Sequence, residues 1–254
     1  MNKYVKNLDR IEFVVTFACT GCCKHCSQGG HENQKEYIDA AKAASIVHDI
    51  ASKYSITSVM SFGGEPLLFP ETVYAIHKAA LEMGIPKRQL ITNGFFSKDS
   101  EKIKTVARNL AQCGINDICL SVDAFHQETI PAGPVKEFAT EIKKLGICIH
   151  SHPAWVASRE HDNPYNRRTT GILEEFQSIG ITPSDGNIII PAGNAIKYLG
   201  SYYDLDKEYT SPYKENPEDI HAICISPDGS AWPLNGNINN TNILEILERY
   251  TPPR

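Results

Sequence analysis

The sequence predicts an α/β protein built on a parallel β-sheet. Apolar, β-branched runs alternate six times with amphipathic, helix-forming stretches along residues 11–192. Each helix in such an alternation returns the chain to the same end of the sheet, which makes neighbouring strands parallel. A curved sheet of six units is a partial (β/α)6 TIM-like barrel. A flat doubly wound sheet fits the same pattern; we expect the partial barrel.

The first two strand–helix units show the pattern most clearly. Residues 11–17 form an apolar, β-branched strand, and residues 37–54 carry apolar side chains at helical spacing. A second strand is expected at residues 56–62. The helix that follows it is expected at residues 71–84, because Gly84 suits a helix C-terminus.

The remaining units repeat the same alternation. Four further strands are expected at residues 88–93, 115–123, 147–155 and 187–192. Helices that follow the first three of them are expected at residues 97–114, 134–146 and 169–180.

The alternation stops after residue 200. Residues 201–221 are rich in tyrosine, proline and charge and are expected to be irregular. Residues 222–236 predict a hairpin, with two short apolar runs around a Pro-Asp-Gly turn, and residues 242–250 predict a final helix. We therefore divide the chain into a core domain, residues 1–200, and a short C-terminal extension, residues 201–254.

The composition excludes several classes of protein. A chain of 254 residues that is 41% hydrophobic suits one globular domain with a small appendage. The net charge of −5 gives no electrostatic case for binding nucleic acid. No apolar run reaches the roughly 18 residues that a membrane span needs. The N-terminal apolar run is shorter than that of a signal peptide, so we expect a cytoplasmic protein with reduced cysteines.

Four of the eight cysteines lie close together, at positions 19, 22, 23 and 26. A disulfide knot is disfavoured in the cytoplasm. A four-thiolate zinc site usually separates its two cysteine pairs by about a dozen residues. In the remaining arrangement Cys19, Cys23 and Cys26 bind three irons of a [4Fe–4S] cluster, which leaves the fourth iron open. Cys22 is then left over.

The segment CTGCCKHC resembles the CxxxCxxC signature of radical S-adenosylmethionine (radical SAM) enzymes. The segments SFGGEPLL, ITNGF and SVDAF follow the next three expected strands, in the order of that family. The resemblance implies Cys19, Cys23 and Cys26 as metal ligands, with a [4Fe–4S] cluster and S-adenosylmethionine as cofactors. It implies reductive cleavage of S-adenosylmethionine to a 5′-deoxyadenosyl radical that abstracts hydrogen, with a one-electron donor such as flavodoxin or ferredoxin.

The resemblance also implies which residues contact S-adenosylmethionine, and most of them have an ordinary structural alternative. The glycine pair can be a plain turn, the following glutamate an exposed charge, the Asn-Gly pair a turn, and the aspartate a helix cap. A histidine stands where the family has an aromatic residue whose backbone meets adenine. The expected cofactor contacts are His25, Gly63, Gly64, Glu65, Pro66, Asn93, Ser121 and Asp123.

The C-terminal hairpin and the segment GNI resemble the SPASM or twitch extension of peptide-modifying radical SAM enzymes. Such extensions hold auxiliary clusters through cysteines, but only Cys224 follows residue 200, so we expect one cluster. Cys224 is either a buried strand residue or a catalytic hydrogen-atom donor. We expect a peptide, protein or small-molecule substrate; a glycyl-radical-enzyme activating enzyme and a non-catalytic metal-binding scaffold are the alternatives.

Two other groups of residues have an open interpretation. His150 and His152 share one face of an expected strand, but as a metal-binding pair they lack an obvious third ligand. We expect them to line the active-site mouth or to cap the strand. Five tyrosines either contact substrate or cover the barrel: Tyr198, Tyr202, Tyr203, Tyr209 and Tyr213.

Overall fold

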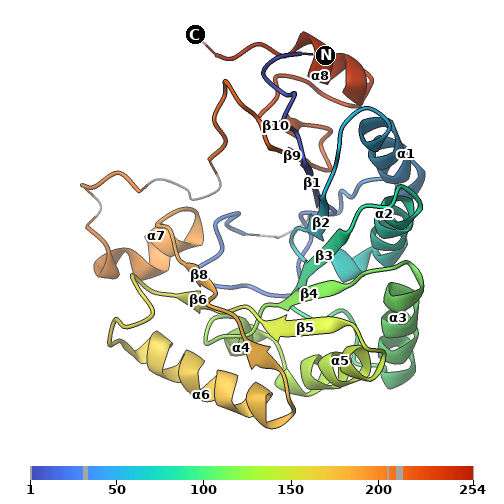
Figure 1. The fold of residues 1–254 in the computed structure, drawn as a ribbon. Coiled ribbons are helices and arrows are strands. Elements are labelled where there is room, and N and C mark those ends of the chain that lie inside the picture. Colours follow the sequence, from blue (N-terminus) through green and yellow to red (C-terminus); the bar gives the residue numbers. More distant parts are fainter. Residues whose placement is uncertain (1, 31–33, 205, 210–213, 254) are drawn as a thin grey trace.

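The chain forms an open, curved β-sheet with helices along its outer side (Figure 1). The structure is a computed structural model that describes residues 2–30, 34–204, 206–209 and 214–253. The strands of the main sheet are, in spatial order, β10 (Ala231–Trp232), β9 (Ala222–Ile225), β1 (Arg10–Val14), β2 (Ser58–Phe62), β3 (Lys87–Thr92), β4 (Asp117–Leu120), β5 (Cys148–Ser151) and β7 (Thr182–Pro183).

All neighbouring strands in this sheet run parallel except β10, which is antiparallel to β9. The parallel pairing confirms the α/β class, and the curved, open sheet is the predicted partial barrel rather than a flat one (Figure 1). Parallel strands place all their carboxyl ends at one edge of the sheet, where the loops that carry function gather.

Four helices cover the outer side of the sheet: α1 (Ala40–Ala51), α2 (Pro70–Glu82), α3 (Ser100–Gln112) and α5 (Ala132–Lys144) (Figure 1). Each buries one apolar stripe, and α3 buries Ile103, Val106, Ala107 and Leu110. Asp39 and Asp99 begin α1 and α3, because their carboxylates accept hydrogen bonds from the first backbone N–H groups.

The sixth strand lies elsewhere than the sequence predicts. The place after β5 is taken by β7, which follows α6 (Pro164–Ser178). In the expected strand at 187–192, only β8 (Asn187–Ile188) forms, and it pairs with β6 (Ala154–Trp155) in a separate two-stranded sheet. The physical reason is the turn at Gly186, whose φ of 75° directs Asn187 N–H to the carbonyl of Pro153 at 2.8 Å.

The C-terminal segment extends the main sheet. The predicted hairpin is β9 and β10, and the predicted final helix is α8 (Ile243–Arg249). β9 pairs in parallel with β1. The segment before β1 contacts the end of α8, where the side-chain amide of Asn2 donates to the carbonyl of Tyr250 at 2.7 Å.

Short helices complete the described part of the chain: η1 (Pro66–Leu68), α4 (His126–Thr129), α7 (Asn194–Leu199) and η2 (Gly200–Tyr202). Within the residues that the structure describes, no helix combines the length and the apolar character needed to cross a bilayer.

Candidate active site

A cavity of about 1180 Å³ opens at the carboxyl ends of the parallel strands. Its wall is built from the segments that follow successive strands, which is where the fold brings distant parts of the sequence together. The predicted site residues that line it are Cys19, Cys23, His25, Cys26, Gly63, Gly64, Asn93 and Ser121.

The loop after β1 presents three cysteines to this cavity. Cys22 is exposed and is not among the described lining residues, whereas Cys19, Cys23 and Cys26 are. Burial raises the pKa of the Cys19 thiol to about 11, and burial with the nearby Asp123 raises the pKa of Cys23 further. The loop is held in place because the carbonyl of Cys26 accepts a hydrogen bond from Asn194 N–H at 2.9 Å.

The glycine pair after β2 packs against the chain just before the cysteine loop. Gly64 N–H donates to the carbonyl of Thr16, and Glu65 N–H donates to the carbonyl of Ala18, both at 2.8 Å. A Cβ on Gly64 would lie 2.1 Å from the Ala18 oxygen, and one on Gly63 would lie 2.5 Å from the Thr16 oxygen. Only glycine allows this close approach.

The Glu65 side chain is fully buried and is not among the described residues that line the cavity. Its carboxylate accepts hydrogen bonds from Leu67 N–H (2.9 Å), the Thr92 hydroxyl (2.7 Å) and Asn93 N–H (2.8 Å). Burial raises the pKa of Glu65 to about 7, against the lowering effect of these bonds. Pro66 begins η1 and is buried. Their contacts with the cofactor stay predictions.

Asn93 connects the end of β3 to the cysteine loop. Its amide nitrogen lies 3.6 Å from Sγ of Cys19 and 3.2 Å from the hydroxyl of Thr20. Its amide oxygen accepts a hydrogen bond from Phe95 N–H at 2.8 Å. Asn93 therefore both lines the cavity and fixes the first cysteine.

Asp123, after β4, is fully buried and binds protein groups with both oxygens. Oδ1 accepts from Phe125 N–H (2.9 Å) and His126 N–H (3.0 Å), and Oδ2 accepts from Ala154 N–H (3.0 Å). Burial opposes its ionisation, but His126 and the hydrogen bonds hold the pKa of Asp123 well below its usual range. The carboxylate thus caps α4, which was the structural alternative, and its contact with the cofactor stays a prediction.

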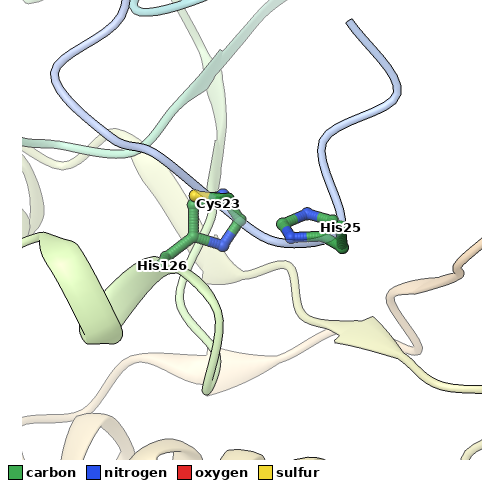
Figure 2. A group of neighbouring side chains, drawn as sticks. All are labelled: Cys23, His25 and His126. Carbon is green, nitrogen blue, oxygen red and sulfur yellow. The ribbon is translucent and has the colours of Figure 1, made fainter. Parts of the chain in front are cut away.

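His25 and His126 lie beside Cys23 (Figure 2). His126, from α4, binds Asp123 Oδ2 through Nδ1 at 2.9 Å; because a carboxylate only accepts, Nδ1 carries the hydrogen. The rings of His25 and His126 lie 4.9 Å apart, and one donor atom from each lies within 4.8 Å of the sulfur of Cys23. Burial lowers the pKa of His25 to about 4, so its ring is neutral at pH 7.

Sequence reasoning missed His126, although the segment D-x-x-H at a strand end was a readable signal for a capped, oriented histidine. It also left the tyrosines undecided. Tyr202, Tyr203 and Tyr209 line the cavity, whereas Tyr198 is exposed and Tyr213 lies outside the described residues.

Cys224 lies on β9, and its register partner on β1 is Glu12. Burial and the neighbouring Glu12 raise the pKa of its thiol to about 12. Cys224 is not among the described residues that line the cavity, and its catalytic role stays a prediction.

The model of one protein family, the Radical SAM superfamily, matches residues 13–151. This chain belongs to the radical SAM superfamily. The match covers more than half of the chain and includes the cysteine loop, the glycine pair and the ends of β3, β4 and β5. Radical SAM proteins carry a [4Fe–4S] cluster and use S-adenosylmethionine, so both are cofactors of this protein.

Curated relatives of this radical SAM protein are named GTP 3′,8-cyclase. The protein of that name from Aquifex aeolicus is 23% identical over 92% of this chain and 76% of the relative. A probable GTP 3′,8-cyclase from Saccharolobus solfataricus is 27% identical, but over 51% of this chain. In that second case the matched region is only 39% of the relative, so this chain spans less than half of its length.

Solved structures with the same fold include SuiB of Streptococcus suis bound to S-adenosylmethionine. It is 14% identical, with a TM-score of 0.61, and the match covers 97% of this chain and 67% of SuiB. The protein anSMEcpe with bound AdoMet and a peptide is also 14% identical, with a TM-score of 0.56, over 95% of this chain and 80% of that one. At such low identity these likenesses establish the shared fold.

The residues of the cavity fit the two cofactors. Burial, reinforced by repulsion from neighbouring negative charges, raises the pKa of Cys19 and Cys23, so these two thiols stay protonated until a cationic cluster displaces their protons. Nδ1 of His25, on the same wall, has no hydrogen-bond partner among the described residues. Cys19, Cys23 and Cys26 would hold the cluster, and Gly63 and Gly64 line the same cavity.

Proposed function

We propose that this radical SAM protein cleaves S-adenosylmethionine reductively at a cluster held by Cys19, Cys23 and Cys26, and abstracts hydrogen from a peptide or protein. The observation that carries the proposal is that all three thiols face one cavity together with the glycine backbone after β2. When bound and reduced by a donor such as flavodoxin or ferredoxin, the cluster supplies the electron that releases the 5′-deoxyadenosyl radical.

The protein's own contribution is to bind, orient and exclude water. Carbonyls of the glycine segment, which lines the cavity, can accept hydrogen bonds from the ammonium group of S-adenosylmethionine. The Asp123–His126 pair fixes the start of α4, and Thr129 of α4 accepts a hydrogen bond from Cys22 N–H of the cysteine loop at 3.2 Å. Phe125 stacks on Tyr165 at 4.8 Å behind the loop, and this apolar packing keeps water from the site.

The chemistry of the cavity wall supports a peptide as the substrate. Away from the cysteines the wall is apolar and aromatic, with Ile188, Ile189, Ile190, Tyr202 and Tyr203. Tyrosine and isoleucine contact peptide side chains and backbone well at protein interfaces. In addition, Ile188 is exposed on β8, a strand with one partner only.

A second candidate substrate is a nucleoside triphosphate, which the likeness to GTP 3′,8-cyclases over 92% of the chain favours. A triphosphate carries several negative charges and is normally bound by Arg and Lys. None of the described residues lining the cavity is Arg or Lys. The wall therefore suits a substrate without clustered negative charge, and the peptide is the better candidate.

The test of the proposed chemistry is the production of 5′-deoxyadenosine. Anaerobically reconstituted protein, reduced with dithionite in the presence of S-adenosylmethionine, should release methionine and 5′-deoxyadenosine in equal amounts. The Cys19→Ala/Cys23→Ala/Cys26→Ala variant should bind no cluster and lose the reaction by at least about 1000-fold. Cys22→Ala is the matched control and should retain both. Unchanged turnover in the triple variant would refute the proposal.

The substrate class is tested by hydrogen transfer. A short peptide encoded beside this chain, deuterated at its side chains, should pass deuterium into 5′-deoxyadenosine. GTP deuterated on its ribose, added in place of the peptide, should leave 5′-deoxyadenosine unlabelled and remain intact. Consumption of GTP with label transfer from its ribose would instead establish the second candidate.

A further inference from the structure

A second group of metal-binding side chains lies on the inner face of β4 and β5. Cys119 on β4 and His150 on β5 are register partners, and His152 follows two residues later on the same face. One donor atom from each of these three residues lies within 4.8 Å of the others. The sequence alone left the two histidines without a third ligand; strand pairing brings Cys119 to them.

We propose that Cys119, His150 and His152 bind a divalent transition-metal ion, with Zn²⁺ as the ion to test. Thiolate and imidazole are the ligands that zinc prefers, and a Cys/His/His set is an established kind of zinc coordination. None of the three belongs to the cysteine loop after β1.

The distances between the three donor atoms are compatible with tetrahedral coordination of a metal ion. Ligand atoms at usual Zn–S and Zn–N distances stand roughly 3.3–3.6 Å apart around zinc. The donors here lie within 4.8 Å of one another, so side-chain rotations that bring them about 1 Å closer complete the site. Binding replaces the thiol proton of Cys119, which is released to the solvent.

Both histidines already have the outer partners that metal ligands need. Nδ1 of His150 faces Oδ1 of Asp117 at 3.5 Å, and Asp117 is itself held by the amide of Gln89 at 2.7 Å. This is the carboxylate–histidine arrangement that orients a ligand and leaves Nε2 for the metal.

The second histidine is oriented by a hydroxyl group. The Ser184 hydroxyl donates to the carbonyl of Ser151 at 3.1 Å, so at 2.9 Å it accepts from Nδ1 of His152. The imidazole also hydrogen-bonds the side chain of Asn187, which is the contact that a metal on Nε2 would compete with.

The position of the group relative to the cavity suggests its use. His152 lines the large cavity, whereas Cys119 and His150 are not among its described lining residues. A metal ion held here would therefore adjoin the cavity beyond the cysteine loop. Three protein ligands with an open fourth position are the arrangement of zinc sites that bind a substrate group. An oxygen or sulfur atom of the substrate is the expected fourth ligand.

The test measures zinc and iron in the same protein. Holoprotein with its cluster intact is dialysed anaerobically against a zinc buffer, and both metals are measured by mass spectrometry. We expect about one zinc ion per chain in addition to the iron. X-ray absorption at the zinc edge should show one sulfur at about 2.3 Å and two imidazole nitrogens at about 2.0–2.1 Å.

Variants assign the ligands. Cys119→Ala and His150→Ala should weaken zinc binding by at least about 100-fold, and Asp117→Asn by about 10-fold, with iron content unchanged in all of them. Two controls should keep zinc: Cys148→Ala, on the same strand face as His150 but outside the set, and His48→Ala, on the exposed side of α1.

Three outcomes would overturn the inference. The first is iron-loaded protein that retains no zinc. The second is zinc retained equally by Cys119→Ala and His150→Ala, with circular dichroism showing that both are folded. The third is zinc that is lost from Cys148→Ala but not from Cys119→Ala. Each is distinct from failure of the proposed function, which is read from 5′-deoxyadenosine.

Discussion

The two faces of the main sheet differ in composition, although the same strands form both. On β4, Ile118 and Leu120 are fully buried against the outer helices, while the alternate residues Asp117 and Cys119 face inward. Because side chains alternate along a strand, the four residues of β4 contribute to both faces. The outer face supplies apolar burial and therefore stability, and the inner face and the carboxyl edge supply polar groups.

The inner face carries a continuous polar network. Nε of Arg10 lies 2.5 Å from Glu12, and its guanidinium also reaches Gln89 at 3.5 Å. Gln89 in turn donates to Asp117, which faces His150. Such a network contributes little apolar burial, so the inner face adds less to the stability of the fold than the outer face does. The following predictions separate the two faces.

The largest effect is expected from Gly64→Ala at the carboxyl edge. The new Cβ would lie 2.1 Å from the Ala18 oxygen and would displace the start of the cysteine loop. We expect cleavage of S-adenosylmethionine to fall by about 100-fold, since small displacements of positioned groups have effects of that size. The measurement is 5′-deoxyadenosine formation. Gly171→Ala, in open space on α6, is the control and should leave the rate unchanged.

Truncation on the outer face should show the opposite behaviour. Phe138 of α5 is fully buried and meets Phe96 edge-to-face at 5.6 Å. Phe138→Ala should lower the free energy of unfolding by about 3–5 kcal/mol. In the fraction that remains folded, the iron content per chain should be normal. Loss of cluster binding in well-folded protein would show that the two faces are not independent.

A buried histidine on the outer face should make the fold sensitive to acid. Burial lowers the pKa of His77 to about 3, and its Nε2 lies 2.8 Å from the Ser61 hydroxyl. The unfolded chain takes up a proton near pH 6.5, so this contribution is complete above that pH and decreases as the pH falls toward 3.

The size of this effect follows from the interval between the two pKa values. Between pH 7 and pH 5, His77 should decrease the free energy of unfolding by about 2 kcal/mol. Urea unfolding at several pH values, with and without His77→Gln, measures this pH dependence of the free energy of unfolding. Both proteins carry the triple cysteine substitution, so that loss of the cluster does not contribute to the result. Equal pH dependence of the two proteins would mean that His77 does not stay neutral in the fold.

The smallest effect is expected from Cys224→Ala. Its thiol lies on the inner face but is not among the described cavity residues, and burial with Glu12 keeps it protonated. We expect turnover to change by less than about 2-fold. If the variant shows full turnover in deuterated water and its product takes up the same amount of deuterium, Cys224 is not a hydrogen-atom donor. Loss of deuterium from the product would establish that role.

Much of the site follows from local sequence, because its residues come directly after strands. The expected strand ends at Phe62 and Asn93 lie within one residue of the ends of β2 and β3, whereas α1 and α3 begin three residues later than expected, after the caps Asp39 and Asp99. The direction in which a side chain points is harder to predict from the sequence. Glu65 is expected at the cofactor, and its carboxylate accepts hydrogen bonds from the N–H of Leu67 in η1 and from the hydroxyl of Thr92 in β3, which lies 27 residues along the chain.

The sequence by itself determined the alternation of strands and helices, the cysteine spacing and the family, because each depends on residues close together in the chain. Only the tertiary structure decided that β8 leaves the main sheet, that His126 stands beside Cys23, and that Cys119 joins His150 and His152. These depend on the pairing of strands and on the packing of loops distant in sequence, and a local pattern carries no information on the register of such contacts.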